Sequence, residues 1–251
     1  MLWYAIVIAV IGVVFVMSLL YFRKKPIRME DIWIINLDKD TERYDTILRQ
    51  SVNIRNLIHR WPATYGKTEP VKDALADGVN TLLSTRKYEK DKDSSKVCSR
   101  NTGAIGCWLS HKRLMRHLSE QRAEDNAGHL ILEDDIQITP GFMDVWETRK
   151  HTIPADWDIV YFDINRPKGL PVGEGIQRVL FTADTGNWGT QAYMVRHGAL
   201  KSRILPKFRF MDSEIDLQLN NCSESLNMYF FSPSILSLNR EMSQHSTIGN
   251  Q

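Results

Sequence analysis

Three consecutive acids follow an apolar run in the stretch "HLILEDDIQI" (residues 129–138). Glu133, Asp134 and Asp135 repel one another, and no basic residue is adjacent to them in the sequence. Carboxylates are hard oxygen ligands that suit Mg²⁺ or Mn²⁺, and these ions take their other ligands from water and substrate phosphates. We therefore interpret the triplet as a site for a metal–diphosphate. The alternative is a solvated turn or a helix cap, because Asp and Glu usually face water.

Two later segments contain further candidates. In "MDSEIDLQL", Asp212 or Asp216 could be the general base that takes a proton from an acceptor hydroxyl. The alternative is a helix start, where acids favour the helix dipole. In "SQHSTIG", the neutral imidazole of His245 is a candidate metal ligand, although histidines in a tail are usually exposed and without function.

Glycines precede the apolar part of a predicted helix at Gly103 and Gly106. Backbone amides at a helix N-terminus attract anions, and glycine permits close approach, so an anion site is one interpretation. An ordinary loop-to-helix junction is the other. His111 lies one to two turns further on, and its pKa suits either a structural or a catalytic role.

The elements that must position these residues alternate between strands and helices. Apolar runs predict strands at 32–37, 130–132, 157–164, 190–195 and 227–232. Helices are predicted from Asp40 or Thr41 to about Val52, after Gly103, at 197–205 and at 212–221, and 84–101 is predicted to be an exposed loop. This order indicates an α/β, Rossmann-type fold with a mainly parallel sheet flanked by helices. Ligands bind at the carboxyl ends of such strands, so Asp163 and the triplet should share one crevice.

The first segment differs from the rest of the chain. Residues 2–22 carry no charge, and 21 residues at about 1.5 Å each span roughly 31 Å, the thickness of a bilayer core. Aromatic residues stand at both ends. A cleaved signal peptide fits less well, because no basic n-region and no small-x-small site are present. We predict a membrane anchor with a basic flank at 1–28 and a catalytic domain at 29–251.

The orientation of this anchor rests on conflicting signals. Four basic residues follow it (Arg23, Lys24, Lys25 and Arg28), which favours a cytoplasmic catalytic domain for this single-pass membrane protein over one in the secretory lumen. The sequon at Asn221 points to the lumen, but isolated sequons are common by chance. The three cysteines form no disulfide framework.

Composition excludes some classes of protein. Of 251 residues, 43% are hydrophobic and 25% are charged, which is typical of a globular protein. The net charge of +2 and the absence of a basic stripe argue against a nucleic-acid partner.

Six pieces of the sequence together resemble glycosyltransferase family 25, which includes lipooligosaccharide galactosyltransferases and collagen hydroxylysine galactosyltransferases. In the order of the family they are "IWIINLDKDTERYDTIL", "RWPATYGK", "GAIGCWLSHKRLM", "LILEDDI", "GTQAYMVRHGALK" and "SPSILSLNREMSQHSTI". The resemblance runs from about Ile32 to Ile248, and six motifs in order are specific where one would be weak.

The resemblance implies a GT-A fold, a UDP-hexose donor, a divalent cation (Mn²⁺ or Mg²⁺) and transfer with inversion to a hydroxyl acceptor on a glycan or protein. It implies that the acidic triplet takes the place of the Asp-x-Asp element of GT-A enzymes, with Asp134 and Asp135 holding the metal and Glu133 touching the ribose or the metal. Asp212 or Asp216 would be the base. The donor would be bound by residues of the matching motifs: Asn36, Asp38, Arg43, Gly103, Gly106, Ser110, His111 and Glu133.

Two other functions compete with a glycosyltransferase. A binding protein could keep the fold without catalysis, and it would bind neither UDP nor manganese if the site were lost. A metal-dependent phosphohydrolase could also use paired acids at strand ends, and it would hydrolyse UDP-sugars rapidly without an acceptor.

Overall fold

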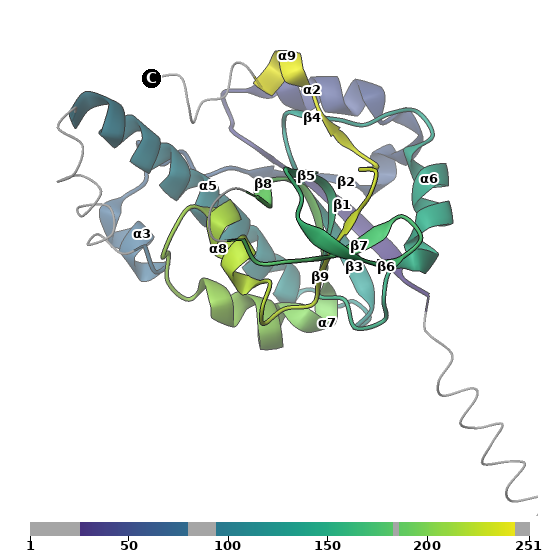
Figure 1. Cartoon of the computed structure of the whole chain (residues 1–251). Helices are drawn as coiled ribbons and strands as arrows, with labels where there is room; N and C mark the ends of the chain where they lie inside the picture. Colours follow the sequence, from purple (N-terminus) through teal and green to yellow (C-terminus); the bar gives the residue numbers. More distant parts are fainter. Residues whose placement is uncertain (1–25, 80–93, 183–185, 244–251) are drawn as a thin grey trace, which may run out of the picture.

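An eight-stranded sheet forms the centre of the structure, a computed structural model that describes residues 26–79, 94–182 and 186–243 (Figure 1). The strands lie in the order β2-β1-β3-β8-β5-β9-β7-β6. Their bounds are β1 Arg28–Asn36, β2 Ile58–Pro62, β3 Ala127–Glu133, β5 Ile159–Asn165, β6 Gly169–Gly173, β7 Ile176–Val179, β8 Trp188–Arg196 and β9 Met228–Phe231. A separate two-stranded sheet pairs β4 (Ile136–Gln137) with β10 (Ser237–Leu238).

Helices surround the sheet. The α-helices are α2 Thr41–Gln50, α3 Val71–Ala76, α5 Ser94–Glu120, α6 Phe142–Arg149, α7 His197–Ala199, α8 Ile215–Cys222 and α9 Arg240–Ser243. Shorter 3₁₀ turns cover Val52–Leu57, Lys150–Thr152 and Leu205–Phe208, and a π-helical turn covers Leu200–Ile204. The predicted α/β fold with helices on both faces of a sheet is therefore confirmed.

The sheet is mixed, so the prediction of a mainly parallel sheet was wrong. β1 pairs in parallel with β2 and β3, and β5 pairs in parallel with β9. The other four pairings are antiparallel: β8 with β3 and with β5, and β7 with β6 and with β9. A two-residue connection with Gly175 at φ 64° joins β6 to β7, and only antiparallel strands can be joined by so short a turn.

The direction of β8 determines what meets at one edge of the sheet. Because β8 runs antiparallel between β3 and β5, its first residues lie beside the last residues of both neighbours. Leu132 of β3 pairs with Ala192, and Asn165 of β5 pairs with Trp188. The amino end of β8 therefore joins the carboxyl ends of β1, β3 and β5 at one edge.

Apolar residues on the two faces of the sheet form two core layers. On one face, Ile35, Ile131 and Tyr193 pack against α5, α8 and the segment 199–208. On the other face, Ile32 and Leu130 pack against α2 and α6. Figure 1 shows this arrangement, with α5, α7 and α8 on one side of the sheet and α2 and α6 on the other. The uninterrupted apolar runs of β3 and β5 follow from burial on both faces.

Several predicted boundaries need correction. The strand predicted at 130–132 is longer and runs from Ala127 to Glu133 as β3; a turn follows, and β4 begins at Ile136. Residues 94–101, predicted as loop, begin helix α5, and 80–93 lie outside the described residues. Of the helix predicted at 197–205, only His197–Ala199 is α-helical, and α8 starts at Ile215 rather than 212.

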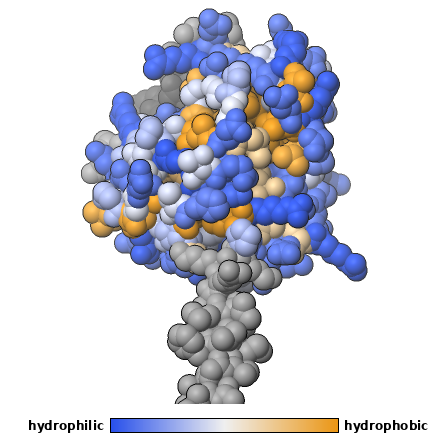
Figure 2. All heavy atoms as spheres, turned by 90° about the vertical axis from the view of Figure 1, so that its right-hand side faces the viewer, coloured by the Kyte–Doolittle hydropathy of each residue, from blue (hydrophilic) through white to orange (hydrophobic). Residues whose placement is uncertain are grey.

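The side of the molecule that carries α6 and the β6–β7 hairpin has no large continuous apolar face (Figure 2). Figure 2 shows the side with α6 and the β6–β7 hairpin, where hydrophobic residues form separate groups among hydrophilic ones. Within the described ranges, no helix has the length and apolar character needed to cross a membrane. The predicted anchor at 2–22 lies outside those ranges.

Candidate active site

The acidic triplet lies where β3 ends and turns away from the sheet. Its middle member, Asp134, is buried and held by two neighbours. Arg43 Nη1 of α2 lies 2.6 Å from Asp134 Oδ1, and Asn36 Nδ2 at the end of β1 donates to Oδ2 at 2.8 Å. Asn36 also donates to the carbonyl oxygen of Asp40, just before α2. Both oxygens of Asp134 are therefore used within the protein.

Asp135, unlike Asp134, has a carboxylate oxygen without a hydrogen-bond partner among the described residues. That atom, Oδ1, is buried. Burial, followed by the charges of Glu133 and Asp134, raises the pKa of Asp135 to about 7. A buried carboxylate oxygen that lacks a donor and lies close to two other acids is costly unless a proton or a cation accompanies it. These features fit a divalent metal, which would satisfy that oxygen and offset the repulsion within the triplet.

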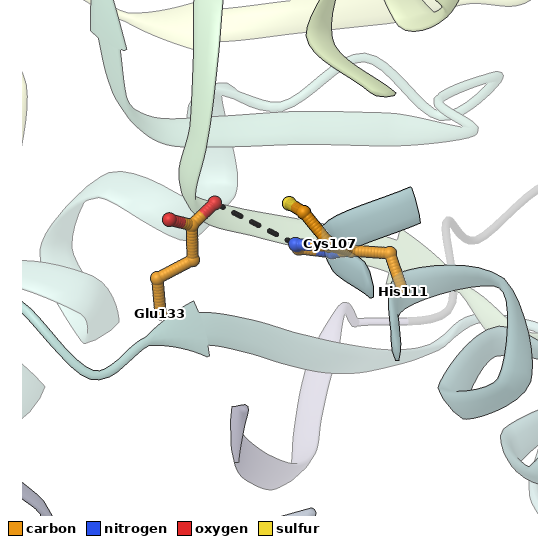
Figure 3. Close-up of side chains that lie close together, drawn as sticks. All are labelled: Cys107, His111 and Glu133. Carbon is orange, nitrogen blue, oxygen red and sulfur yellow. Dashed lines mark ion pairs between the residues drawn. The ribbon is translucent and has the colours of Figure 1, made fainter. Parts of the chain in front are cut away.

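Glu133, the first acid, faces helix α5. Thr190 Oγ1 of β8 donates to Glu133 Oε1 at 2.5 Å, and His111 Nε2 lies 3.5 Å from the same oxygen. Burial alone would raise the pKa of Glu133, but His111, Thr190 and Arg43 together bring it below its ordinary value. Figure 3 shows Cys107 and His111 of α5 pointing toward this carboxylate.

Two pockets meet at this edge of the sheet. The first has about 740 Å³ of empty space, and the second has about 880 Å³. Both are lined by Cys107, Glu133 and Asp135, which therefore lie at their junction. The remaining lining of the first pocket is Ile35, Leu37, Arg43, Ala63, Thr64, Tyr65, Gly66, Lys67, Thr102, Gly103, Ser110, His111 and Asp134.

One wall of the first pocket depends on close backbone contact between α5 and the segment after β2. A Cβ atom on Gly106 would lie 2.6 Å from the carbonyl oxygen of Thr64, and one on Gly66 would lie 1.8 Å from that of Thr102. Ser110 Oγ accepts a hydrogen bond from the amide of Thr64 at 2.8 Å and donates to the carbonyl of Gly106 at 2.6 Å. The glycines and Ser110 thus fix residues 64–66 against the helix.

The expectation that a helix begins beside Gly103 and Gly106 was wrong. Both residues lie inside α5, which begins at Ser94, so their amides belong to the interior of a helix and not to its free first turn. The polar composition of 94–101 hid the true start of this helix. Gly103 lines the first pocket, whereas Gly106 is buried against the 64–66 segment.

The second pocket contains one of the two candidate bases. Asp216, in the first turn of α8, lines it together with Asn165, Gly189 and Gln191. Burial raises the pKa of Asp216, and the amides of Leu217 (2.8 Å) and Gly189 (3.3 Å) donate to its oxygens.

Some predicted residues lie apart from this junction. Asp212 is exposed, bonds Ser213 and lines neither of the two pockets. Asp38 also lies outside both linings and pairs with Arg60 at 2.6 Å. Asp163, which was expected to share a crevice with the triplet, lines neither pocket; its Oδ2 accepts a hydrogen bond at 3.2 Å from Gln191, a residue of the second pocket. His245 lies outside the described residues.

The structure adds residues that the sequence did not single out. Tyr65 and Lys67 line the first pocket, and Cys107 lines both pockets. Thr190 and Tyr193 of β8 hold Glu133 and His111. The motif "RWPATYGK" contains Tyr65 and Lys67, so it could have pointed to them, but no sequence signal placed β8 beside β3.

An α/β sheet with acid-lined pockets at the carboxyl ends of its strands is the arrangement of a ligand-binding α/β enzyme. The family model described as glycosyltransferase family 25 (LPS biosynthesis protein) matches residues 29–169, more than half of the chain. The chain therefore belongs to glycosyltransferase family 25, and the resemblance found in its motifs is confirmed.

Curated relatives agree with this assignment. A procollagen galactosyltransferase 1-B of Xenopus laevis is 26% identical over 180 residues, covering 69% of this chain and 28% of that protein. A glycosyltransferase 25 family member of Drosophila melanogaster is 27% identical over 216 residues, 80% of this chain and 34% of its own length. Human procollagen galactosyltransferase 2 is 26% identical over 179 residues, with 68% and 27% covered. The matches thus span about a third or less of these relatives.

Proposed function

We propose that this chain is a metal-dependent glycosyltransferase that moves a hexose from a UDP-sugar to a hydroxyl group on a glycan or protein, with inversion. The observation that carries the proposal is the meeting of two pockets at Glu133 and Asp135. Group transfer needs a donor and an acceptor on either side of one reacting carbon. The first pocket would hold the nucleotide and the second would hold the acceptor.

The lining of the first pocket suits a nucleoside diphosphate. Arg43 and Lys67 supply positive charge for phosphate oxygens, and Tyr65 supplies an aromatic ring for a base. Arg43 is held by Asp134, so its guanidinium is oriented before any ligand binds. Asn36 and Ser110 are already bonded within the protein, and we propose that they contribute by positioning Asp134 and residues 64–66.

A divalent cation, Mn²⁺ or Mg²⁺, would be held by Asp135 through the oxygen that lacks a hydrogen-bond partner, next to Asp134 and Glu133. When bound, it would supply Lewis-acid stabilisation of the negative charge on the departing diphosphate. Asp134 would act mainly by fixing the turn, because both its oxygens are bonded to Asn36 and Arg43. His245 stays a proposed further ligand.

Asp216 is the proposed general base. As the acceptor oxygen forms its bond to the anomeric carbon and the bond to the diphosphate breaks, the hydroxyl proton passes to the Asp216 carboxylate. Asp216 lines the second pocket that Glu133 and Asp135 share, and Asp212 does not. A pKa raised by burial makes Asp216 a stronger base than an exposed aspartate.

The donor and acceptor are proposed from the relatives. Two of them are named procollagen galactosyltransferases, and the family description names lipopolysaccharide biosynthesis. UDP-galactose is therefore the first donor to test, with collagen peptides and lipopolysaccharide as acceptors.

We further propose that residues 2–22 anchor the protein in a membrane as a single span, with the catalytic domain facing the cytoplasm. The uncharged segment and the basic residues that follow it support this topology. Protease treatment of sealed vesicles of known orientation tests it: protection of the catalytic domain in vesicles whose cytoplasmic face is outside would contradict it.

A donor screen tests the proposed activity. UDP-galactose, UDP-glucose and the UDP-N-acetylhexosamines are incubated with manganese, with and without acceptors, and both the transferred sugar and released UDP are measured. We expect transfer from one UDP-hexose, dependent on metal and lost in Asp135→Asn. Rapid hydrolysis without acceptor would favour a phosphohydrolase instead, and the absence of UDP and manganese binding would favour a non-catalytic protein.

A further inference from the structure

We propose that Cys107, His111 and Glu133 form a second metal site, one for Zn²⁺ or a transition metal of similar preference, distinct from the oxygen site at Asp135. One ligand atom from each residue is available, and the three atoms lie within 4.8 Å of one another. Figure 3 shows the three side chains converging from α5 and β3. Cys107 and His111 are four residues apart on a helix, so they share one face.

His111 is the residue that points most directly to a missing ligand. Its side chain is completely buried, and its Nε2 atom has no hydrogen-bond partner among the described residues. Its other nitrogen, Nδ1, lies 2.8 Å from Tyr193 Oη. If Nδ1–H donates to Tyr193, the Nε2 lone pair is free and directed toward Glu133, 3.5 Å away. A partner on the far ring nitrogen is what orients a metal-binding histidine.

Glu133 is held in a comparable way. Thr190 Oγ1 donates to Glu133 Oε1 at 2.5 Å, so β8 supplies the outer partners of both Glu133 and His111. A thiolate from Cys107 and the Glu133 carboxylate would neutralise the two charges of the cation. On binding, the Cys107 thiol loses its proton to the solvent as the sulfur–metal bond forms, and no electron is transferred.

The set of ligand atoms selects the metal. Sulfur, imidazole nitrogen and carboxylate oxygen together suit zinc or cobalt, whereas magnesium and manganese prefer oxygen ligands alone. Three protein ligands leave a fourth position open. Because Cys107 and Glu133 line both pockets, that position would face the junction of the pockets. If the proposed function holds, zinc at this site would inhibit glycosyl transfer, because it would bind the Glu133 carboxylate.

Cobalt titration of the full chain tests the site without any measurement of transfer. The protein is stripped with a chelator and titrated with Co²⁺, and zinc affinity is then measured by competition with a coloured chelator. We expect the wild-type protein to show a thiolate-to-cobalt charge-transfer band that is absent in Cys107→Ser. In this variant the affinity for zinc should fall by more than about 100-fold, which is a larger loss than the removal of an outer-shell partner causes. The control is Cys222→Ser, because Cys222 is a free cysteine that lies outside the cluster.

Tyr193→Phe provides a second, milder test. It should keep the charge-transfer band and weaken zinc by about 10- to 100-fold, because it removes the partner of His111 Nδ1. The proposal is overturned if the wild-type chain gives no band, or if Cys107→Ser, folded by circular dichroism, binds zinc as the wild type does. A cobalt band in a protein without transferase activity would contradict the proposed function and leave this site standing.

Discussion

Arg43 Nη1 of helix α2 lies 2.6 Å from Asp134 Oδ1. The charge of the middle acid of the triplet is therefore neutralised inside the protein, by a residue 91 positions away in the sequence. The same guanidinium donates through Nη2 to the carbonyl of Met242, just before the end of the described chain. One side chain therefore ties α2, the triplet and α9 together at the edge of the first pocket.

Arg43→Met should destabilise the protein by about 1–3 kcal/mol, because it leaves the buried Asp134 carboxylate without its charged partner. Urea unfolding measures the change. Arg49→Met is the matched control, since Arg49 lies on the same helix, is exposed and donates a hydrogen bond to the neutral side chain of Thr46. Equal stability of the two variants would show that the ion pair contributes nothing measurable.

The raised pKa of Asp135 predicts a pH dependence of stability in metal-free protein. Between about pH 4 and pH 7 the folded chain binds a proton on Asp135 that the unfolded chain releases, so the free energy of unfolding falls as pH rises through this window. Asp135→Asn removes this proton uptake. Relative to wild type, the variant should gain on the order of a few kcal/mol at about pH 8 and little at about pH 4. Parallel stability–pH curves for the two proteins would refute the raised pKa.

Replacing each candidate base in turn shows which of Asp212 and Asp216 takes the proton. We expect Asp216→Asn to lower kcat by about 100- to 10,000-fold, because it removes the proton acceptor, and Asp212→Asn to leave kcat close to that of wild type. Steady-state kinetics with saturating donor and acceptor measure both. Full activity in Asp216→Asn would place the base elsewhere.

Close contact between two backbone segments makes Gly66 a sensitive position. A Cβ atom there would lie 1.8 Å from a helix carbonyl oxygen, so Gly66→Ala must displace residues 64–67 from α5. We expect a loss of about 1–3 kcal/mol in stability and weaker UDP binding, since this segment lines the first pocket. Gly173→Ala is the control, because its Cβ would meet only a side-chain methyl of Ile176 at 3.3 Å and the more distant Thr152 carbonyl at 3.9 Å. A Gly66→Ala variant as stable as this control would contradict the close packing.

The sequence could predict those features that depend on one continuous segment of the chain. The buried strand that ends in Glu133 is visible because apolar residues run without interruption up to the acids, and a strand buried on both faces requires that pattern. The position of Asp135 at the edge of the sheet followed from it, and the structure agrees.

What the sequence could not predict depends on pairing between distant segments. The antiparallel insertion of β8 beside β3 brings Thr190 and Tyr193 to Glu133 and His111, and no local pattern encodes which strand a segment will pair with. For the same reason, the sequence could place Cys107 and His111 on one face of a helix, but it could not place them next to Glu133, which follows 22 or more residues later.

Calorimetry of UDP and manganese binding tests the central claim most directly, because it measures the shared ion without needing the right acceptor. Wild-type protein should bind UDP with manganese present and much more weakly after chelation, and Asp135→Asn should lose the effect of manganese while keeping its fold. If Asp135→Asn binds UDP and manganese as the wild type does, or if the wild type binds neither, the metal-dependent account of this site is wrong.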